Sequence, residues 1–93
     1  MLRIYLEEKC ASVTVRVQGK IAGESVETLE RFCCDLVKDR PNANLIIDLD
    51  EVLIIDQEGE QLLRQLHSRG VTLQGRGMHS KYLVERIQKR VAS

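Results

Sequence analysis

Apolar side chains change their spacing several times along this chain, and the order of those changes limits the folds that it can adopt. Within residues 2–7 and 13–18, apolar and polar residues alternate one by one, which is the period of a β-strand buried on one face. A short turn over residues 9–12 joins these two predicted strands. Apolar residues then recur every three or four positions, which predicts a helix over residues 24–39.

The second half of the chain changes from strand to helix twice more. Residues 45–47 form an apolar run typical of a central strand, and we expect residues 48–55 to form a loop whose apolar side chains tuck under the domain. Asp56 is the N-cap candidate of a second helix that ends at Gly70. Residues 71–74 alternate as a fourth strand, and we expect Ser80 to cap a third helix. The order ββαβαβα predicts an α/β domain with a mixed four-stranded sheet and helices mainly on one face.

The size and composition of the chain fit one domain. Ninety-three residues can bury a modest core, so we expect a single domain over residues 1–93. No apolar stretch reaches the roughly 18 residues that span a membrane, and the first residues do not resemble a secretion signal. The three cysteines form neither a CxxC motif nor an even-numbered disulfide framework. We therefore expect a soluble cytoplasmic protein, with Cys33 in the core and Cys34 at the flank of the first helix.

Charge and aromatic content argue against a nucleic-acid partner. Acidic and basic residues balance at 14 each, and only three aromatic residues are present, too few for a base-stacking platform. The charge is unevenly spread, since an acidic run is followed by a basic C-terminal part. The acidic run contains Asp48, Asp50, Glu51, Asp56, Glu58 and Glu60. Such a run is either solvated surface or an acidic patch that faces a partner.

Gly59 requires a structural reason, because a glycine in the first turn of a helix costs about 1 kcal/mol relative to alanine. It shares a helix face with the leucines of the second helix, so we expect the helix start to approach the sheet closely. Gln57 and Glu58 would then be held at a helix N-terminus, which favours an anion or a phosphoryl group. The simpler alternative is that Asp56 and Glu58 only stabilise the charge of the helix end.

Two segments resemble the STAS domains, the fold of the anti-sigma factor antagonists. Residues 45–59, LIIDLDEVLIIDQEG, are similar to the central signature of an apolar strand, D-L, a short loop and D-S-S/T-G opening a helix. Residues 17–22, VQGKIA, resemble the G-x-L-D turn before the first helix of that family. The resemblance covers essentially the whole chain. It implies a non-catalytic module of bacterial signalling that regulates transcription by binding another protein.

The chain departs from that family at the residues that carry its switch. In anti-sigma factor antagonists, a partner kinase that is also the anti-sigma factor phosphorylates the first serine of D-S-S/T-G, and this breaks the complex. Gln57 occupies that serine position and Glu58 the next, so neither offers a hydroxyl, and Ala22 replaces the usual acid after Gly19. We expect binding without this switch, and we hypothesise that Glu58 supplies a fixed negative charge.

The resemblance also implies which residues meet a partner. The expected binding motif consists of Asp56, Gln57, Glu58, Gly59 and Glu60, and the expected secondary interface of Gly19, Lys20, Ala22 and Gly23. The partner would be an anti-sigma factor or a serine-kinase-like protein, and a homodimer is possible. The alternative is a STAS accessory subunit of a transporter or of a larger signalling assembly.

Catalysis and metal binding find little support in the sequence. The acidic residues do not have the spacing of a calcium-binding loop. We expect His67 to lie at the surface near the end of the second helix and His79 to lie in the loop before the third helix. No nucleophile stands beside a base in a recognisable motif. We therefore expect no enzymatic activity, no metal and no cofactor.

Overall fold

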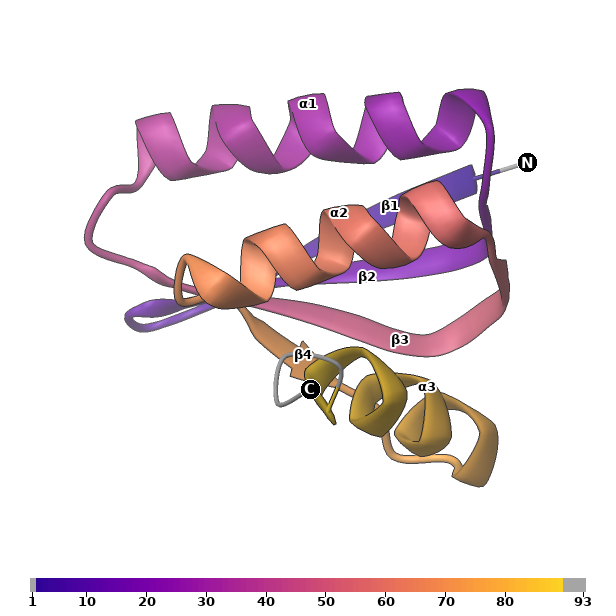
Figure 1. Cartoon of the computed structure of the whole chain (residues 1–93). Coiled ribbons are helices and arrows are strands. Elements are labelled where there is room, and N and C mark those ends of the chain that lie inside the picture. The colour runs from indigo at the N-terminus through magenta and orange to yellow at the C-terminus, as the bar shows by residue number, and fades with distance from the viewer. Residues whose placement is uncertain (1, 90–93) are drawn as a thin grey trace.

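The structure is a computed structural model that describes residues 2–89. Its elements follow the predicted order, as Figure 1 shows: β1 (Leu2–Lys9), β2 (Ser12–Ile21), α1 (Glu24–Asp39), β3 (Asn44–Ile55), α2 (Gln57–Ser68), β4 (Thr72–Gln74) and α3 (Met78–Lys89). The strands form one sheet in the order β1-β2-β3-β4. The β1–β2 pair is antiparallel, and β2–β3 and β3–β4 are parallel, so the predicted mixed sheet is confirmed.

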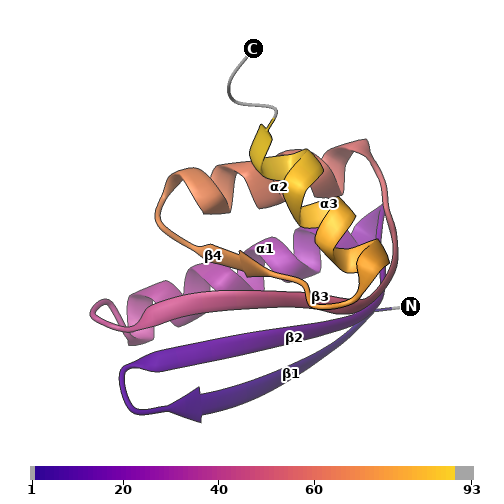
Figure 2. The same ribbon diagram turned by 90° about the horizontal axis from the view of Figure 1, so that it is seen from below.

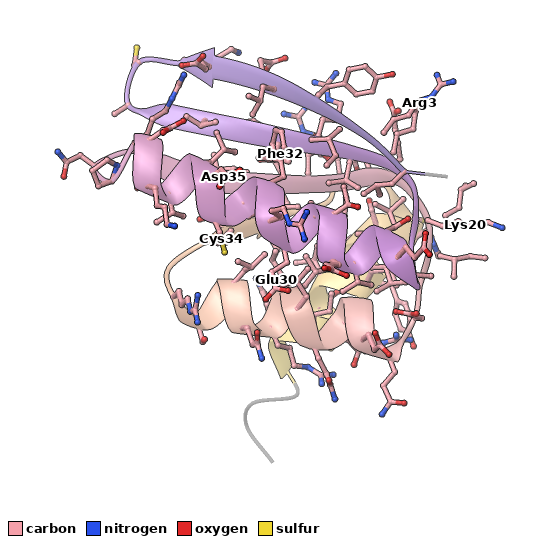
Figure 3. The ribbon with its side chains drawn as sticks, turned by 90° about the horizontal axis from the view of Figure 1, so that it is seen from above. Arg3, Lys20, Glu30, Phe32, Cys34 and Asp35 are labelled. Atoms are coloured by element: carbon pink, nitrogen blue, oxygen red, sulfur yellow. The ribbon has the colours of Figure 1, made fainter. Side chains whose placement is uncertain are left out.

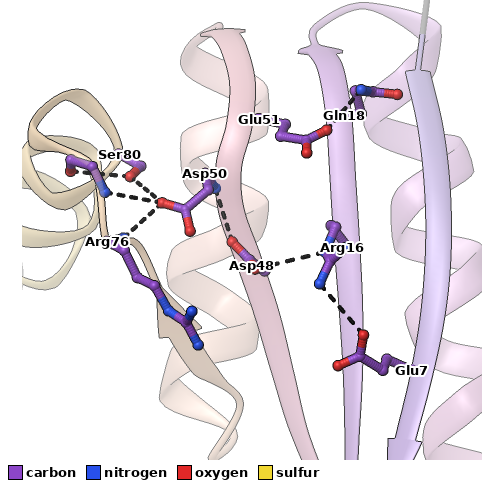
Figure 4. A network of polar contacts seen from close by, with 9 residues as sticks. Glu7, Arg16, Gln18, Asp48, Asp50, Glu51, Arg76 and Ser80 are labelled. Atoms are coloured by element: carbon purple, nitrogen blue, oxygen red, sulfur yellow. Dashed lines mark hydrogen bonds and ion pairs between the residues drawn. The ribbon is translucent and has the colours of Figure 1, made fainter.

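The core lies between one face of the sheet and helices α1 and α2. Val15 and Val17 of β2 and Ile47 of β3 are fully buried against Leu29 of α1 and Leu63 of α2. Figure 4 shows α1 and α2 passing behind the same face of the strands. The third helix, α3, packs against α2, β3 and β4 at the β4 side of the sheet (Figure 2). This arrangement confirms that the helices gather mainly on one face.

The prediction of a loop over residues 48–55 is wrong, because β3 continues through them to Ile55. Its partner β2 also runs past Gly19, where the prediction stopped, to Ile21. The register between the two strands shifts between Arg16 and Gln18 and again between Gly19 and Lys20. Such irregularities interrupt the alternation of inward and outward side chains, and alternation is the signal by which a strand is recognised in a sequence.

The start of the third helix also differs from the prediction. The helix begins at Met78, so Ser80 lies inside its first turn and is not its cap. His79 is exposed, as expected, but belongs to the helix and not to a preceding loop. The Ser80 side chain is buried, and its Oγ donates a hydrogen bond to Asp50 Oδ1 at 2.6 Å. A strand residue therefore fixes the helix start, a contact that no local sequence pattern reveals.

Other sequence expectations are confirmed. Cys33 is buried in the core and Cys34 is half-buried beside it on α1. Gly70 follows α2 with a left-handed φ of 101°, as expected for a residue that ends a helix. Within residues 2–89, none of the helices combines the length and the apolar character needed to cross a membrane.

Candidate partner-binding surface

A single carboxylate connects the starts of α1 and α2. Asp56 Oδ1 accepts a hydrogen bond from the backbone N–H of Gly59 at 2.7 Å, which confirms Asp56 as the N-cap of α2. Asp56 Oδ2 accepts a second one from the N–H of Gly23, the N-cap residue of α1, at 3.0 Å. The bonds from Gly59 and then Gly23 stabilise the charged form and hold the pKa of the Asp56 carboxyl below its ordinary value.

Gly59 lies where α2 meets the end of β2, as its sequence position predicted. A Cβ atom at Gly59 would lie 2.5 Å from the backbone oxygen of Ile21 and 3.1 Å from the Cγ2 of Ile55. No side chain larger than hydrogen fits at this position without displacing the backbone. The same Ile21 oxygen accepts a hydrogen bond from the N–H of Asp56 at 3.1 Å. The two predicted regions, residues 19–23 and 56–60, are therefore brought together.

Gln57 and Glu58 stand exposed in the first turn of α2. Lys20 is also exposed near the end of β2, and Figure 3 shows its side chain pointing away from the domain. Gly19 lies beside it in the strand, and Ala22 and Gly23 form the connection to α1. The two segments thus present one cation, one anion and one amide around a helix N-terminus.

Sequence reasoning missed two exposed apolar residues that come shortly before this helix start in the chain. Leu53 is 67% exposed and Ile54 is 50% exposed at the end of β3, where Ile54 pairs with Lys20 in the sheet register. The sequence feature that could have indicated their exposure is their position inside an acidic run. The expectation that their side chains tuck under the domain is wrong. We use the term helix-start surface for Lys20, Leu53, Ile54, Gln57 and Glu58.

Glu60 faces α3 instead of the helix-start surface. Its carboxylate forms ion pairs with Arg64 on the same helix and with Arg86 on α3, where Arg86 Nε lies 3.1 Å from Glu60 Oε1. The side chain is only 16% exposed. Glu60 therefore holds α2 against α3, and its position in the motif does not make it a surface residue.

Asp48 and Glu51, two other residues of the acidic run, lie on β3 and make contacts with β2. Asp48 is buried on the face opposite α1 and α2, with one oxygen 3.9 Å from Arg16 Nε. Glu51 accepts a hydrogen bond from the amide of Gln18 at 2.6 Å. Figure 4 shows these contacts along neighbouring strands. Simple solvation is therefore wrong for Asp48, and an acidic patch that faces a partner stays a prediction for the exposed residues of the run.

Asp50 anchors the start of α3. Its Oδ1 accepts hydrogen bonds from the backbone N–H of Arg76 at 2.6 Å, the N–H of Gly77 at 3.1 Å and the hydroxyl of Ser80 at 2.6 Å (Figure 4). The Ser80 bond is the largest cause of a fall in the pKa of Asp50 to about 2. This anchoring role was not predicted, because the residues concerned are far apart in the sequence.

The part of the chain that the structure describes offers no metal centre, since no three His, Cys, Asp or Glu side chains gather to hold an ion. His67 Nδ1 lies 3.3 Å from the backbone oxygen of Val71, in a structural contact near the end of α2. Arg90, which belongs to the basic C-terminal part, lies outside the described residues. The chemistry available at the helix-start surface is that of binding.

Comparison with known proteins identifies the fold. No family model and no curated protein matches the sequence. An anti-sigma factor antagonist from Mycobacterium paratuberculosis is similar over 99% of this chain and 82% of that one, with a TM-score of 0.77 and 19% identity. The anti-sigma factor antagonist SpoIIAA in its unphosphorylated form aligns over 97% and 81% of the two chains, with a TM-score of 0.64 and 14% identity.

A third solved structure supports the same assignment. It is a protein from Shewanella loihica with a SpoIIAA-like fold, which aligns over 98% of this chain and 76% of that one, with a TM-score of 0.59 and 18% identity. Likenesses at these identities show the fold, and the function still depends on the site. The chain has the STAS fold of the anti-sigma factor antagonists.

Proposed function

We propose that this chain is a non-catalytic regulatory module, similar to the anti-sigma factor antagonists, that binds a protein partner through its helix-start surface. The observations that carry the proposal are the exposure of Leu53 and Ile54 at the end of β3 and of Gln57 and Glu58 in the first turn of α2, a helix start that Asp56 holds in place. Two solved structures of the same fold are anti-sigma factor antagonists. An anti-sigma factor or a related serine kinase is therefore the proposed partner.

The composition of the helix-start surface suits a protein interface. Leu53 and Ile54 can be buried by a partner, and each square ångström of apolar surface removed from water contributes about 25 cal/mol. Lys20, which pairs with Ile54 in the sheet register, and Glu58 in the first turn of α2 can orient the partner through complementary charges. Asp56 already fixes the backbone here, so binding requires little further ordering.

The proposed partner binding is not controlled by phosphorylation at residues 57 and 58. Gln57 has an amide in place of a hydroxyl, and Glu58 has a carboxylate. The exposed Glu58 carboxylate stands in the first turn of α2, where negative charge is favoured. We propose that this permanent charge keeps the module in one signalling state. The three cysteines are all free thiols, which suits a reducing cytoplasm as the place of action.

The first experiment is affinity capture from native lysate with the wild-type protein and a Glu58→Lys variant, with bound proteins identified by mass spectrometry. We expect an anti-sigma factor or serine-kinase-like protein with the wild type and its loss with the variant. Glu30→Lys is the matched control, because Glu30 is exposed on α1 and the charge change is the same. Recovery of transporter subunits with all three proteins would overturn the proposal and favour an accessory subunit.

A second experiment tests the apolar part of the surface. The captured protein is titrated by calorimetry against wild-type protein, Leu53→Asp and Ile54→Asp. Each variant is expected to weaken binding by roughly tenfold or more, because it places a charge where apolar area would be buried. Equal affinity of all three proteins would show that the partner contacts another surface.

The absence of the switch is tested by restoring the hydroxyl. A captured kinase is expected to phosphorylate Gln57→Ser in the presence of ATP and to leave the wild-type helix start unmodified, as measured by mass spectrometry of the intact protein and its peptides. Gln61→Ser is the control, since Gln61 is exposed one turn further along α2. Phosphorylation of the wild-type chain that released the partner would contradict the proposal.

A further inference from the structure

The two edge strands of the sheet differ in length and in whether another element packs beside them. The β4 edge has three residues, and α3 packs beside it. The β1 edge has eight residues, and no described element lies beyond it (Figure 2). An edge strand of this length presents backbone N–H and C=O groups that can pair with another strand. Most of its side chains are exposed, and Tyr5 and Leu6 remain 48% and 45% exposed.

The side chains of β1 divide between two faces of the sheet. Leu2, Ile4 and Leu6 lie on the core face, because in the register Ile4 is opposite Val17 and Leu6 is opposite Val15. Arg3, Tyr5 and Glu7 lie on the other face. The outer face therefore reads cation, aromatic ring, anion along the strand. When a second copy of the strand runs in the opposite direction, the cation of each strand faces the anion of the other.

We propose that two copies of this chain pair through β1 as antiparallel strands centred on Tyr5, and so form a symmetric homodimer with one continuous sheet. In this register Arg3 of each copy lies opposite Glu7 of the other, and the two Tyr5 rings are neighbours. On the core face, Ile4 of each copy lies opposite Leu6 of the other. These pairs join opposite charges, aromatic rings or apolar side chains, which stabilise a sheet, and the one unmatched pair is Leu2 opposite Glu8 at the ends of the strands.

Other registers match less well. Along an edge strand only every second residue points its N–H and C=O groups outward. These residues must face one another across the dimer, so a symmetric pair can be centred on a residue but not between two residues. Centring the pair on Leu6 would place Arg3 opposite Lys9, two like charges. Centring it on Ile4 would leave Glu7 beyond the core of the pair and Arg3 opposite Tyr5. A parallel pair in register would place each charge opposite itself, which destabilises a sheet.

The dimer is expected to be concentration-dependent, because its contact is one strand wide and its ion pairs are exposed. It uses none of the residues of the helix-start surface. Binding of a partner there and pairing through β1 can therefore be measured separately, and the failure of one leaves the other standing.

The test uses charge exchange, measured by sedimentation equilibrium on untagged protein at low salt over a range of concentrations. Wild type is expected to dimerise. Arg3→Glu and Glu7→Arg are each expected to weaken dimerisation by roughly tenfold or more, since each turns two attractive pairs into repulsive ones. An equimolar mixture of the two variants is expected to restore a heterodimer, because the two glutamates on β1 of one chain then face the two arginines on β1 of the other.

The mixture distinguishes a loss of strand pairing from damage to the fold, because two damaged proteins would not restore a dimer when mixed. Glu7→Arg also removes the contact of Glu7 with Arg16 within the chain, so the melting temperature of each variant is measured alongside. Glu30→Arg on α1 is the control for the change in net charge and is expected to dimerise like the wild type. A wild type that stays monomeric, or a mixture that dimerises no better than the single variants, would overturn the proposal.

Discussion

The carboxylate of Asp56 accepts a hydrogen bond from the backbone N–H of Gly23, 3.0 Å away and 33 residues earlier in the chain. Its other oxygen accepts the N–H of Gly59 in α2. The start of one helix is therefore held by the cap of the other. This bond places the connection after β2 beside the first turn of α2, and it is the reason why the proposed partner would meet both segments as one rigid surface.

Replacing Asp56 with alanine removes both hydrogen bonds and is expected to lower the melting temperature by about 5 °C. Asp56→Asn keeps one side-chain oxygen and is expected to lie between the alanine variant and the wild type. Thermal unfolding followed by circular dichroism measures the effect, with Glu30→Ala as the control for loss of an exposed carboxylate. An alanine variant as stable as the control would contradict a bridging role for Asp56.

Gly59→Ala is expected to destabilise the protein by about 1–3 kcal/mol, because the new Cβ meets the backbone oxygen of Ile21 at 2.5 Å. In an unrestricted helix position the same change would stabilise by about 1 kcal/mol, so the sign of the effect is diagnostic. Urea unfolding measures it, and Gln61→Ala at an exposed position of α2 provides the comparison. A stabilised Gly59→Ala variant would show that α2 is not pressed against β2.

The anchoring of α3 by Asp50 is expected to depend on pH. The native pKa of about 2 lies below the ordinary value of 3.8, so the charged carboxylate favours the folded state at neutral pH. That contribution is lost as the pH falls from about 4 to about 2, where the native carboxyl itself becomes protonated. Urea unfolding of wild type and Asp50→Ala should therefore show a difference in the free energy of unfolding at pH 7 that shrinks below pH 4. A difference that stays the same at all pH values would contradict an anchoring role for the charged carboxylate.

The three thiols are expected to react at different rates. Burial raises the pKa of Cys33 to about 12, and its thiol should resist alkylation until the protein unfolds, because the thiolate is the reactive form. Cys10 is exposed in the turn between β1 and β2 and should react first. Iodoacetamide labelling followed by peptide mass spectrometry, in the native state and in urea, measures the order. Fast native labelling of Cys33 would mean that α1 opens readily.

Prediction from the sequence succeeded where the signal was local. Helix α1 was predicted with the bounds that the structure shows, since its apolar residues keep a helical spacing throughout. Asp56 and Gly59 were recognised from the chemistry of a helix start, and the structure places both as expected. The second half of β3 was missed, because the register shifts against β2 disturb its alternation. Ser80 has the sequence context of a local cap, although its partner Asp50 is 30 residues away.

By itself the sequence determined the order of the elements, most of the core faces of the strands and helices, and the absence of a hydroxyl at residues 57 and 58. These follow from side-chain chemistry and from spacing along one segment. Only the tertiary structure decided that Glu60 holds α3, that Asp50 anchors it, and that Leu53 and Ile54 remain exposed. Each of these depends on which side chains from distant segments meet, and the spacing of residues within a segment carries no information about its neighbours in space.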